Sequence, residues 1–277
     1  MVKSFLKSVL PEPLRKTAKA ANTIRSQLPD PVLVYQMSKV GSSTVSTSLR
    51  NAGIRNIHVH FVGEHWSKAA QHHRERGDEL PQNLYRGRVL RYWLRVRRMQ
   101  VKVITLVRDP VARKLSSAFQ LRRYSPDLSV DDASAAKRWL RENIDFGESP
   151  PYESVWFDRE IKAVFDIDVY NHPFDSEKGF TRIQTPRADV LVLRLEDLDA
   201  LIPSVVSDFV GAQLTVERTN TRSDDTYQTI KRTFSLPTST LERVYSQPMV
   251  QHFYSDREVD SFINAWSEPT LSVQSSP

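Results

Sequence analysis

The sequence contains no cysteine. This absence excludes disulfide bonds, thiol nucleophiles, iron–sulfur clusters and cysteine-ligated zinc. Long apolar runs are also missing: the longest, near Val101–Val107 and residues 190–195, are far shorter than the roughly 20 residues that a bilayer span needs. The basic N-terminal segment, interrupted by Pro11 and Pro13, lacks the hydrophobic stretch of a signal peptide. We therefore expect a cytoplasmic protein, with peripheral membrane contact as an alternative role for the basic segment.

The overall composition is that of an ordinary globular chain. Of the 277 residues, 39% are hydrophobic and 26% are charged, with a formal net charge of +6. These values exclude a disordered, collagen-like or coiled-coil chain, and the positive charge favours anionic partners. We expect a basic helical extension over residues 1–30, a single domain over 31–267 and a frayed tail over 268–277.

Short apolar or alternating runs predict five strands, at residues 32–36, 56–62, 101–107, 167–170 and 190–194. Helical patterns fall between and after them, at residues 42–51, 64–76, 83–98, 109–124, 130–142 and 152–164. The C-terminal part is predicted to be helical, with capping boxes starting at Ser239 and Ser255. Strands that alternate with helices predict an α/β fold with a central, mainly parallel sheet and helices on both faces.

The most informative segment, QMSKVGSST at residues 36–44, joins the first strand to the first helix. A helix N-terminus offers unpaired N–H groups and a positive dipole end, and Gly41 permits a close backbone approach. Lys39 adds a charge and residues 42–44 add three hydroxyl groups, so the loop can hold an anion. A plain strand–turn–helix connection is the alternative. The segment is not a Walker A loop, because Lys39 precedes Gly41.

A second segment, TLVRDPVARKLSSAFQ at residues 105–120, has the same strand-to-helix form. The apolar strand ends at Arg108. Asp109 can cap the next helix and Pro110 suits its first position.

The two segments together resemble sulfotransferases that use 3′-phosphoadenosine 5′-phosphosulfate (PAPS). The order Lys-x-Gly-Ser-Ser/Thr is similar to their 5′-phosphosulfate loop. More closely, QMSKVGSST resembles the loop of bacterial capsular polysaccharide synthesis proteins, which look like members of that superfamily. Looser likeness continues through VLVLRLEDL and HFYSDREVDSFINAW. The chain lacks the Arg-Lys-Gly loop of the cytosolic branch and the Lys-Trp-Tyr-Ser signature of the capsular group.

The resemblance implies a sulfotransferase fold with a P-loop-like phosphate loop, and transfer of a sulfuryl group from PAPS to a hydroxyl of a carbohydrate or glycolipid. The product would be adenosine 3′,5′-bisphosphate, and no metal is expected. Lys39 would stabilise the leaving group, Arg108 and Ser116 would hold the 3′-phosphate, and Lys231 in TYQTIKRTF would close the nucleotide site. The 5′-phosphate would be held by Lys39, Val40, Gly41, Ser42, Ser43 and Thr44.

The acceptor hydroxyl needs a general base. On the strand NIHVHFV, His58 and His60 share one face, opposite the apolar residues. This His-x-His strand is similar to the one that carries the catalytic histidine of uronyl 2-O-sulfotransferases. By that match His60 is the base and His58 binds or orients, while Glu64 is the alternative base.

The densest basic run, YRGRVLRYWLRVRR, contains six arginines between Arg86 and Arg98. It is either a solvated helix face or a surface for an anionic acceptor or a membrane, and Arg122 and Arg123 could line the same groove. No nucleic-acid-binding module is recognised, so no nucleic-acid partner is expected. Two other functions stay open. One is a non-catalytic nucleotide- or polyanion-binding protein of polysaccharide assembly, and the other is a small-molecule kinase with a modified phosphate loop.

Overall fold

The structure is a computed structural model that describes residues 11–96, 100–121, 151–217 and 225–268, together with Ser134, Lys137, Arg138, Leu140 and Arg141. The chain divides into two compact units. The sheet unit comprises Met1–Val107 and Val155–Asn220, and the helical unit comprises Arg108–Ser154 and Thr221–Pro277. Several predicted features lie wholly or largely outside the described residues, namely the helix at 130–142, the tail after residue 268, Arg97, Arg98, Arg122 and Arg123.

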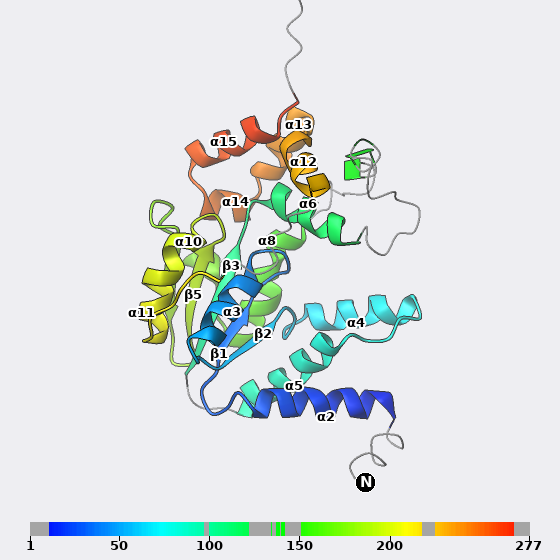
Figure 1. Cartoon of the computed structure of the whole chain (residues 1–277), viewed down its shortest axis with the longest axis vertical. Coiled ribbons are helices and arrows are strands. Elements are labelled where there is room, and N and C mark those ends of the chain that lie inside the picture. The colour runs from blue at the N-terminus through cyan, green and yellow to red at the C-terminus, as the bar shows by residue number, and fades with distance from the viewer. Residues whose placement is uncertain are drawn as a thin grey trace, which may run out of the picture. The chain divides into compact units, whose positions relative to one another are not determined.

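The sheet unit is built on five strands in the order β2-β1-β3-β5-β4 (Figure 1). Strands β2, β1, β3 and β5 are parallel, and β4 pairs antiparallel with β5. The side chains of β1 and β5 are all buried, which explains the apolar runs VLVY in β1 and VLVL in β5. The predicted α/β fold is confirmed. The strands are β1 Val32–Tyr35, β2 Asn56–Val59, β3 Val101–Val107, β4 Phe180–Gln184 and β5 Ala188–Arg194.

Helices and short helical turns connect these strands. The first helix, α2, packs against α5 and buries Ala20 and Ile24, so one face of the basic extension belongs to the fold. No helix in the described parts of the chain is long and apolar enough to cross a membrane. The early helices are α2 Glu12–Arg25, α3 Ser42–Asn51, α4 His65–Glu75 and α5 Gln82–Val96. The later segments are α8 Tyr152–Phe157, the π-helix η2 Asp158–Lys162, α9 Ala163–Phe165, the 3-10 turn η3 Val169–Asn171, α10 Leu198–Leu201, the π-helix η4 Ile202–Val206 and α11 Ser207–Val210.

Three strand predictions differ from the structure. The prediction of a strand at residues 167–170 is wrong, because this buried segment enters the 3-10 turn η3. The edge strand β4, FTRIQ, was not predicted, since only Ile183 among its side chains is buried and its apolar signal is weak. Strand β2 ends at Val59, three residues before the predicted end, because the chain then turns toward η2.

The helical unit contains α6 Pro110–Leu121, α12 Asp225–Thr233, α13 Thr238–Tyr245, α14 Pro248–Phe253 and α15 Asp256–Trp266. The capping box at Ser255 is confirmed. The one predicted at Ser239 is wrong, because α13 already begins at Thr238, directly after Pro237, and Ser239 lies inside its first turn.

Asp109 organises the start of α6, as the sequence predicts. Its carboxylate accepts hydrogen bonds from the backbone N–H of Val111 at 3.0 Å and of Ala112 at 3.4 Å. It also accepts from the Tyr245 hydroxyl at 2.7 Å and from Trp266 Nε1 at 2.9 Å. Burial raises the pKa of Asp109 above its ordinary value, although the hydrogen bonds from Tyr245, Trp266 and the Val111 N–H act to lower it. The cap thus also ties α6 to α13 and α15.

Candidate anion-binding and catalytic site

The loop between β1 and α3 has a left-handed backbone at two positions. Lys39 has φ 69° and Gly41, the residue before α3, has φ 86°. The positive φ of Gly41 favours glycine there, and an added Cβ atom, 2.3 Å from Leu195 Cδ1, would also displace that side chain. The loop therefore bends sharply and directs the chain into α3.

The N-terminus of α3 has the properties of an anion site. Its first turn contains no acidic residue, and the Thr44 N–H bonds back to the Gly41 carbonyl at 3.0 Å. Among the described residues, nothing accepts a hydrogen bond from the N–H of Ser42 or Ser43. The Val40 side chain is buried, so only its backbone can contact a ligand. The structure thus brings the six predicted loop residues together at a helix N-terminus, where the dipole favours negative charge.

His60, directly beyond β2, is tied to the same loop. Its Nδ1 atom lies 2.9 Å from the carbonyl oxygen of Gln36. Because a carbonyl only accepts hydrogen bonds, Nδ1 carries the proton of the neutral ring and Nε2 keeps its lone pair. Burial lowers the pKa of His60, and the positive charge of Lys39 lowers it further, against the opposing effect of the Gln36 carbonyl. His60 is therefore held as a neutral imidazole, and Nε2 is the ring atom that could accept a proton.

His58, on β2, is the neighbour of His60. The two rings meet edge to face with centroids 4.8 Å apart. Burial, followed by the His60 ring and Arg86, lowers the pKa of His58 to about 3. Its buried Nε2 atom has no hydrogen-bond partner among the described residues. His58 is thus uncharged at neutral pH, and its contact with the His60 ring suits an orienting role better than proton transfer.

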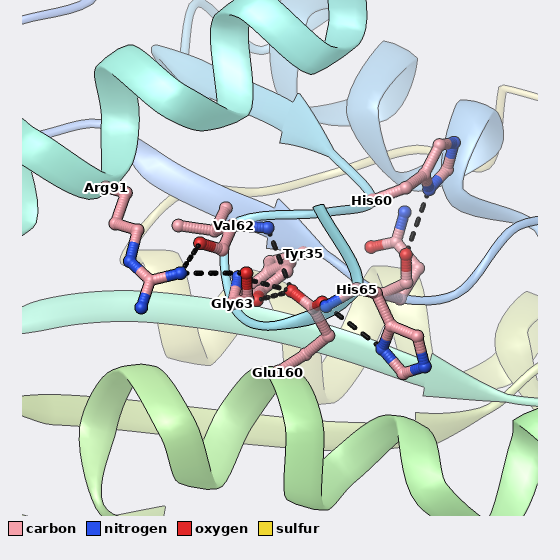
Figure 2. A network of polar contacts seen from close by, with 8 residues as sticks. Tyr35, His60, Val62, Gly63, His65, Arg91 and Glu160 are labelled. Carbon is pink, nitrogen blue, oxygen red and sulfur yellow. Dashed lines mark hydrogen bonds and ion pairs between the residues drawn. The ribbon is translucent and has the colours of Figure 1, made fainter. Parts of the chain in front are cut away.

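A fully buried carboxylate, Glu160 on η2, holds the turn that follows His60 (Figure 2). It accepts hydrogen bonds from the backbone N–H of Val62 at 2.8 Å, Gly63 at 2.6 Å and His65 at 2.9 Å. The Tyr35 hydroxyl donates to it as well, and burial together with the Glu160 charge raises the pKa of Tyr35. Glu160 therefore connects the end of β1 to the chain after β2.

Arg91 on α5 binds the same turn from the opposite side, and we call the contacts of Glu160 and Arg91 with Val62 and Gly63 the clamp (Figure 2). Its Nη1 atom donates to the Gly63 carbonyl at 2.9 Å and to the Val62 carbonyl at 3.3 Å. Val62 and Gly63 thus each donate a backbone N–H to the Glu160 carboxylate and accept at the carbonyl from the Arg91 guanidinium. Gly63 is needed here, because a Cβ atom would lie 2.2 Å from the Arg159 carbonyl oxygen.

The sequence did not point to this clamp. Glu160 lies in FDREIKAVF, which reads as an ordinary helix with charged residues on its surface. The π-helical turn places Glu160 inward, and π-helical turns occur frequently at functional sites. Glu64, the alternative base, is exposed, and its N–H donates to the Arg159 carbonyl at 2.8 Å.

The remaining predicted nucleotide contacts belong to the helical unit. Arg108 is half-buried before α6, Ser116 is buried within α6 and Lys231 is exposed on α12. Their roles toward the loop stay predictions. Arg113, one turn before Ser116, is engaged with the buried carboxylate of Glu153, with its Nε atom 2.8 Å from Oε1.

The arginines of α5 have different environments. Arg86 donates to the His58 carbonyl at 3.0 Å, and Arg91 holds the turn already described. Arg88 lies over the Trp66 ring, 5.8 Å from its centroid, and Arg95 is exposed. Part of the basic run is therefore structural, and part of it faces solvent.

Comparison with known proteins gives one family match. Residues 140–255 match the family model described as "Putative capsular polysaccharide synthesis protein". No curated protein and no solved structure matches the chain. The matched region includes β4, β5 and the helices from α8 to α14. It does not include the loop at residues 39–44 or His60. The match associates the chain with capsular polysaccharide synthesis.

Proposed function

We propose that the protein is a PAPS-dependent sulfotransferase of capsular polysaccharide synthesis, which sulfates a hydroxyl of a carbohydrate or glycolipid. One observation carries the proposal. The anion loop before α3 and the neutral base His60 form one arrangement, joined by the hydrogen bond from His60 Nδ1 to the Gln36 carbonyl. A phosphate-binding element beside a general base is what transfer from a nucleotide donor to a hydroxyl requires.

The loop fits the 5′-phosphosulfate end of PAPS. The N–H groups of Ser42 and Ser43 and the hydroxyls of residues 42–44 would bind the phosphate oxygens at the positive end of α3. Lys39 would stabilise the charge that builds on the leaving phosphate. Arg108 and Ser116 would hold the 3′-phosphate and Lys231 would cover it, by resemblance to the family.

When bound, PAPS supplies a sulfuryl group with adenosine 3′,5′-bisphosphate as the leaving group. His60 Nε2 removes the proton of the acceptor hydroxyl while the acceptor oxygen bonds to sulfur and the bond from sulfur to the phosphate oxygen breaks. Because the pKa of His60 is lowered, the imidazole is unprotonated at neutral pH and ready to act. We therefore expect the acid limb of kcat/KM to lie below the ordinary histidine pKa of about 6.5.

The first test is calorimetric binding of adenosine 3′,5′-bisphosphate, with 5′-AMP and ATP as controls. We expect bisphosphate to bind much more tightly than AMP, Lys39→Ala to weaken binding by about tenfold, equivalent to about 1.4 kcal/mol, and Arg108→Ala to remove the preference over AMP. Equal affinity for bisphosphate and AMP would refute the PAPS assignment. Preferred binding of ATP with Mg²⁺ would favour a kinase instead.

The second part of the test separates an enzyme from a binding protein. His60→Ala should retain bisphosphate affinity and lose transfer of label from radioactive PAPS to capsular polysaccharide. Glu64→Gln is the matched control, because that carboxylate is exposed, and it should retain transfer. If the wild type binds bisphosphate but labels no acceptor hydroxyl, a non-catalytic role in polysaccharide assembly is the better description.

A further inference from the structure

A second candidate site lies in the sheet unit, in a cavity of about 220 Å³. If each water molecule occupies about 30 Å³, the cavity has room for roughly seven waters, or for one small charged group. Three of its lining side chains are arginines, three are apolar and none is acidic. The lining residues are Arg91, Leu94, Arg95, Ala163, Val164 and Arg187.

Among the residues that the structure describes, no carboxylate pairs with the arginines of this cavity, two of which, Arg95 and Arg187, are exposed. Arg91 is held in place by the carbonyls of Val62 and Gly63, which leave its charge uncompensated (Figure 2). Within the described chain, the guanidinium groups of Arg95 and Arg187 have no hydrogen-bond or ion-pair partner. Three positive charges around one cavity repel each other, and a bound oxyanion would relieve that repulsion. Guanidinium groups suit this task, because their planar donors match carboxylate, sulfate and phosphate oxygens.

Arg187 marks the part of the cavity that lies at the N-terminal ends of β3 and β5, whereas the anion loop follows the C-terminal end of β1. Arg187 directly precedes β5, and its carbonyl accepts from the Val101 N–H at the start of β3. Lys39, in contrast, follows the C-terminal end of β1. Strands β1, β3 and β5 are all parallel, so Lys39 and Arg187 lie at opposite ends of these strands. The seven residues of β5 alone span roughly 20 Å at about 3.3 Å per residue. An anion bound beside Arg187 is therefore distinct from a phosphate group bound at the loop.

We propose that this cavity binds the oxyanion of an acidic saccharide chain, at a site separate from the anion loop. Leu94, Ala163 and Val164 offer the apolar surface against which a sugar ring can pack, while the arginines bind its carboxylate, sulfate or phosphate. The binding of an oxyanion follows from the cavity itself. Its assignment to a saccharide rests on the proposed function.

The test compares the double variant Arg95→Gln/Arg187→Gln with Arg74→Gln, which removes an exposed arginine of α4 outside the cavity. The probe is a glucuronate-containing oligosaccharide, with a neutral oligosaccharide of equal length and sodium sulfate as further ligands. We expect the acidic oligosaccharide to bind the double variant at least tenfold more weakly than the wild type, and the Arg74→Gln variant to match the wild type. The neutral oligosaccharide should not bind.

Bisphosphate affinity, measured on the same proteins, separates this proposal from the proposed function. We expect it to be unchanged in the double variant, which also shows that the fold is intact. If neither the wild type nor any variant binds bisphosphate, but oligosaccharide binding still depends on the two arginines, the sulfotransferase proposal fails and the cavity is still supported as an oxyanion site. Equal losses of oligosaccharide affinity in the double variant and in Arg74→Gln would show that binding depends on general positive charge and would overturn the proposed site in the cavity. Binding of sulfate or of phosphatidylglycerol vesicles that depends on the two arginines, without oligosaccharide binding, would overturn the saccharide assignment.

Discussion

Each of the two units contains a buried carboxylate that collects several donors, and the two carboxylates work over different distances. Asp109 accepts from N–H groups two and three residues ahead on its own helix, and then from Tyr245 and Trp266. Glu160 accepts from Tyr35 and from a turn after β2, with every one of these donors 95 to 125 residues away. Asp109 stabilises the start of its own helix as well as distant residues, whereas Glu160 binds only residues that are distant in the sequence.

This difference has an energetic consequence. Without Asp109, the N–H groups of Val111 and Ala112 lose their acceptor, but the Ala112 bond is already long at 3.4 Å and relief from burying a charge offsets part of the loss. Without Glu160, the N–H groups of Val62 and Gly63 lose their acceptor in a buried turn, and an unsatisfied buried donor costs about 1–3 kcal/mol. We therefore expect the sheet unit to be more sensitive to its carboxylate than the helical unit.

The largest expected effect is that of Glu160→Ala. This change leaves three backbone N–H groups and the Tyr35 hydroxyl without their acceptor, so we expect the free energy of unfolding to fall by about 3–5 kcal/mol. Urea denaturation followed by circular dichroism measures the loss. Glu64→Ala, which removes a nearby exposed carboxylate, is the control and should stay within about 0.5 kcal/mol. A loss below about 1 kcal/mol for Glu160→Ala would contradict the clamp.

The next effect is that of Asp109→Ala, which removes the cap of α6 and the ties to α13 and α15. A lost cap costs about 1 kcal/mol and the two buried side-chain donors add to it, while relief from burying a charge offsets part of the loss. We expect about 2–3 kcal/mol in the same urea experiment. If Asp109→Ala proves more destabilising than Glu160→Ala, the proposed order of the two units is wrong.

The two tyrosine hydroxyls offer a matched pair of smaller changes. Tyr35→Phe and Tyr245→Phe each remove one hydrogen bond to a buried carboxylate, and each should cost about 1.5 kcal/mol. Combined with Glu160→Ala, Tyr35→Phe should add almost nothing, because its acceptor is already gone. Tyr245→Phe should add its full cost in that background. Additive losses for both tyrosines would show that Tyr35 does not act through Glu160.

The smallest effect is a change in pH dependence. Burial raises the pKa of Asp109, so the folded chain binds a proton at a pH where the unfolded chain, with an ordinary aspartate pKa near 3.8, does not. As pH falls toward that value, protonation of Asp109 favours the folded state. Asp109→Asn cannot take up this proton. The stability difference between wild type and Asp109→Asn should therefore grow from pH 7 to pH 4 in urea titrations, and a constant difference would contradict the raised pKa.

The sequence predicts those parts of the fold that local patterns encode. The mainly apolar sequences of β1, β3 and β5 indicate buried parallel strands, and the Asp109-Pro110 pair marks the start of α6. The strand β4 could not be predicted, because it is half-exposed and depends on pairing with β5. The turn η3 was mistaken for a strand, because its apolar residues are buried without any sheet partner.

The candidate site divides in the same way. The loop at residues 39–44 could be predicted, because a lysine, a glycine and three hydroxyls between a strand and a helix form a local pattern. The orientation of His60 could not, because it depends on a carbonyl 24 residues earlier in the chain. Glu160 could not be predicted either, because a π-helical turn leaves no mark in the sequence and its partners are remote.

Lys39 adopts a left-handed backbone conformation, with φ 69°. A side chain other than glycine in this conformation carries a strain of about 1–2 kcal/mol. Replacement by glycine would release that strain, while the greater freedom of glycine in the unfolded chain would cost about 0.4–1 kcal/mol. Lys39→Gly should thus fold at least as well as the wild type and yet lose anion affinity. If Lys39 has the proposed role in anion binding, this one residue would exchange some folding stability for function.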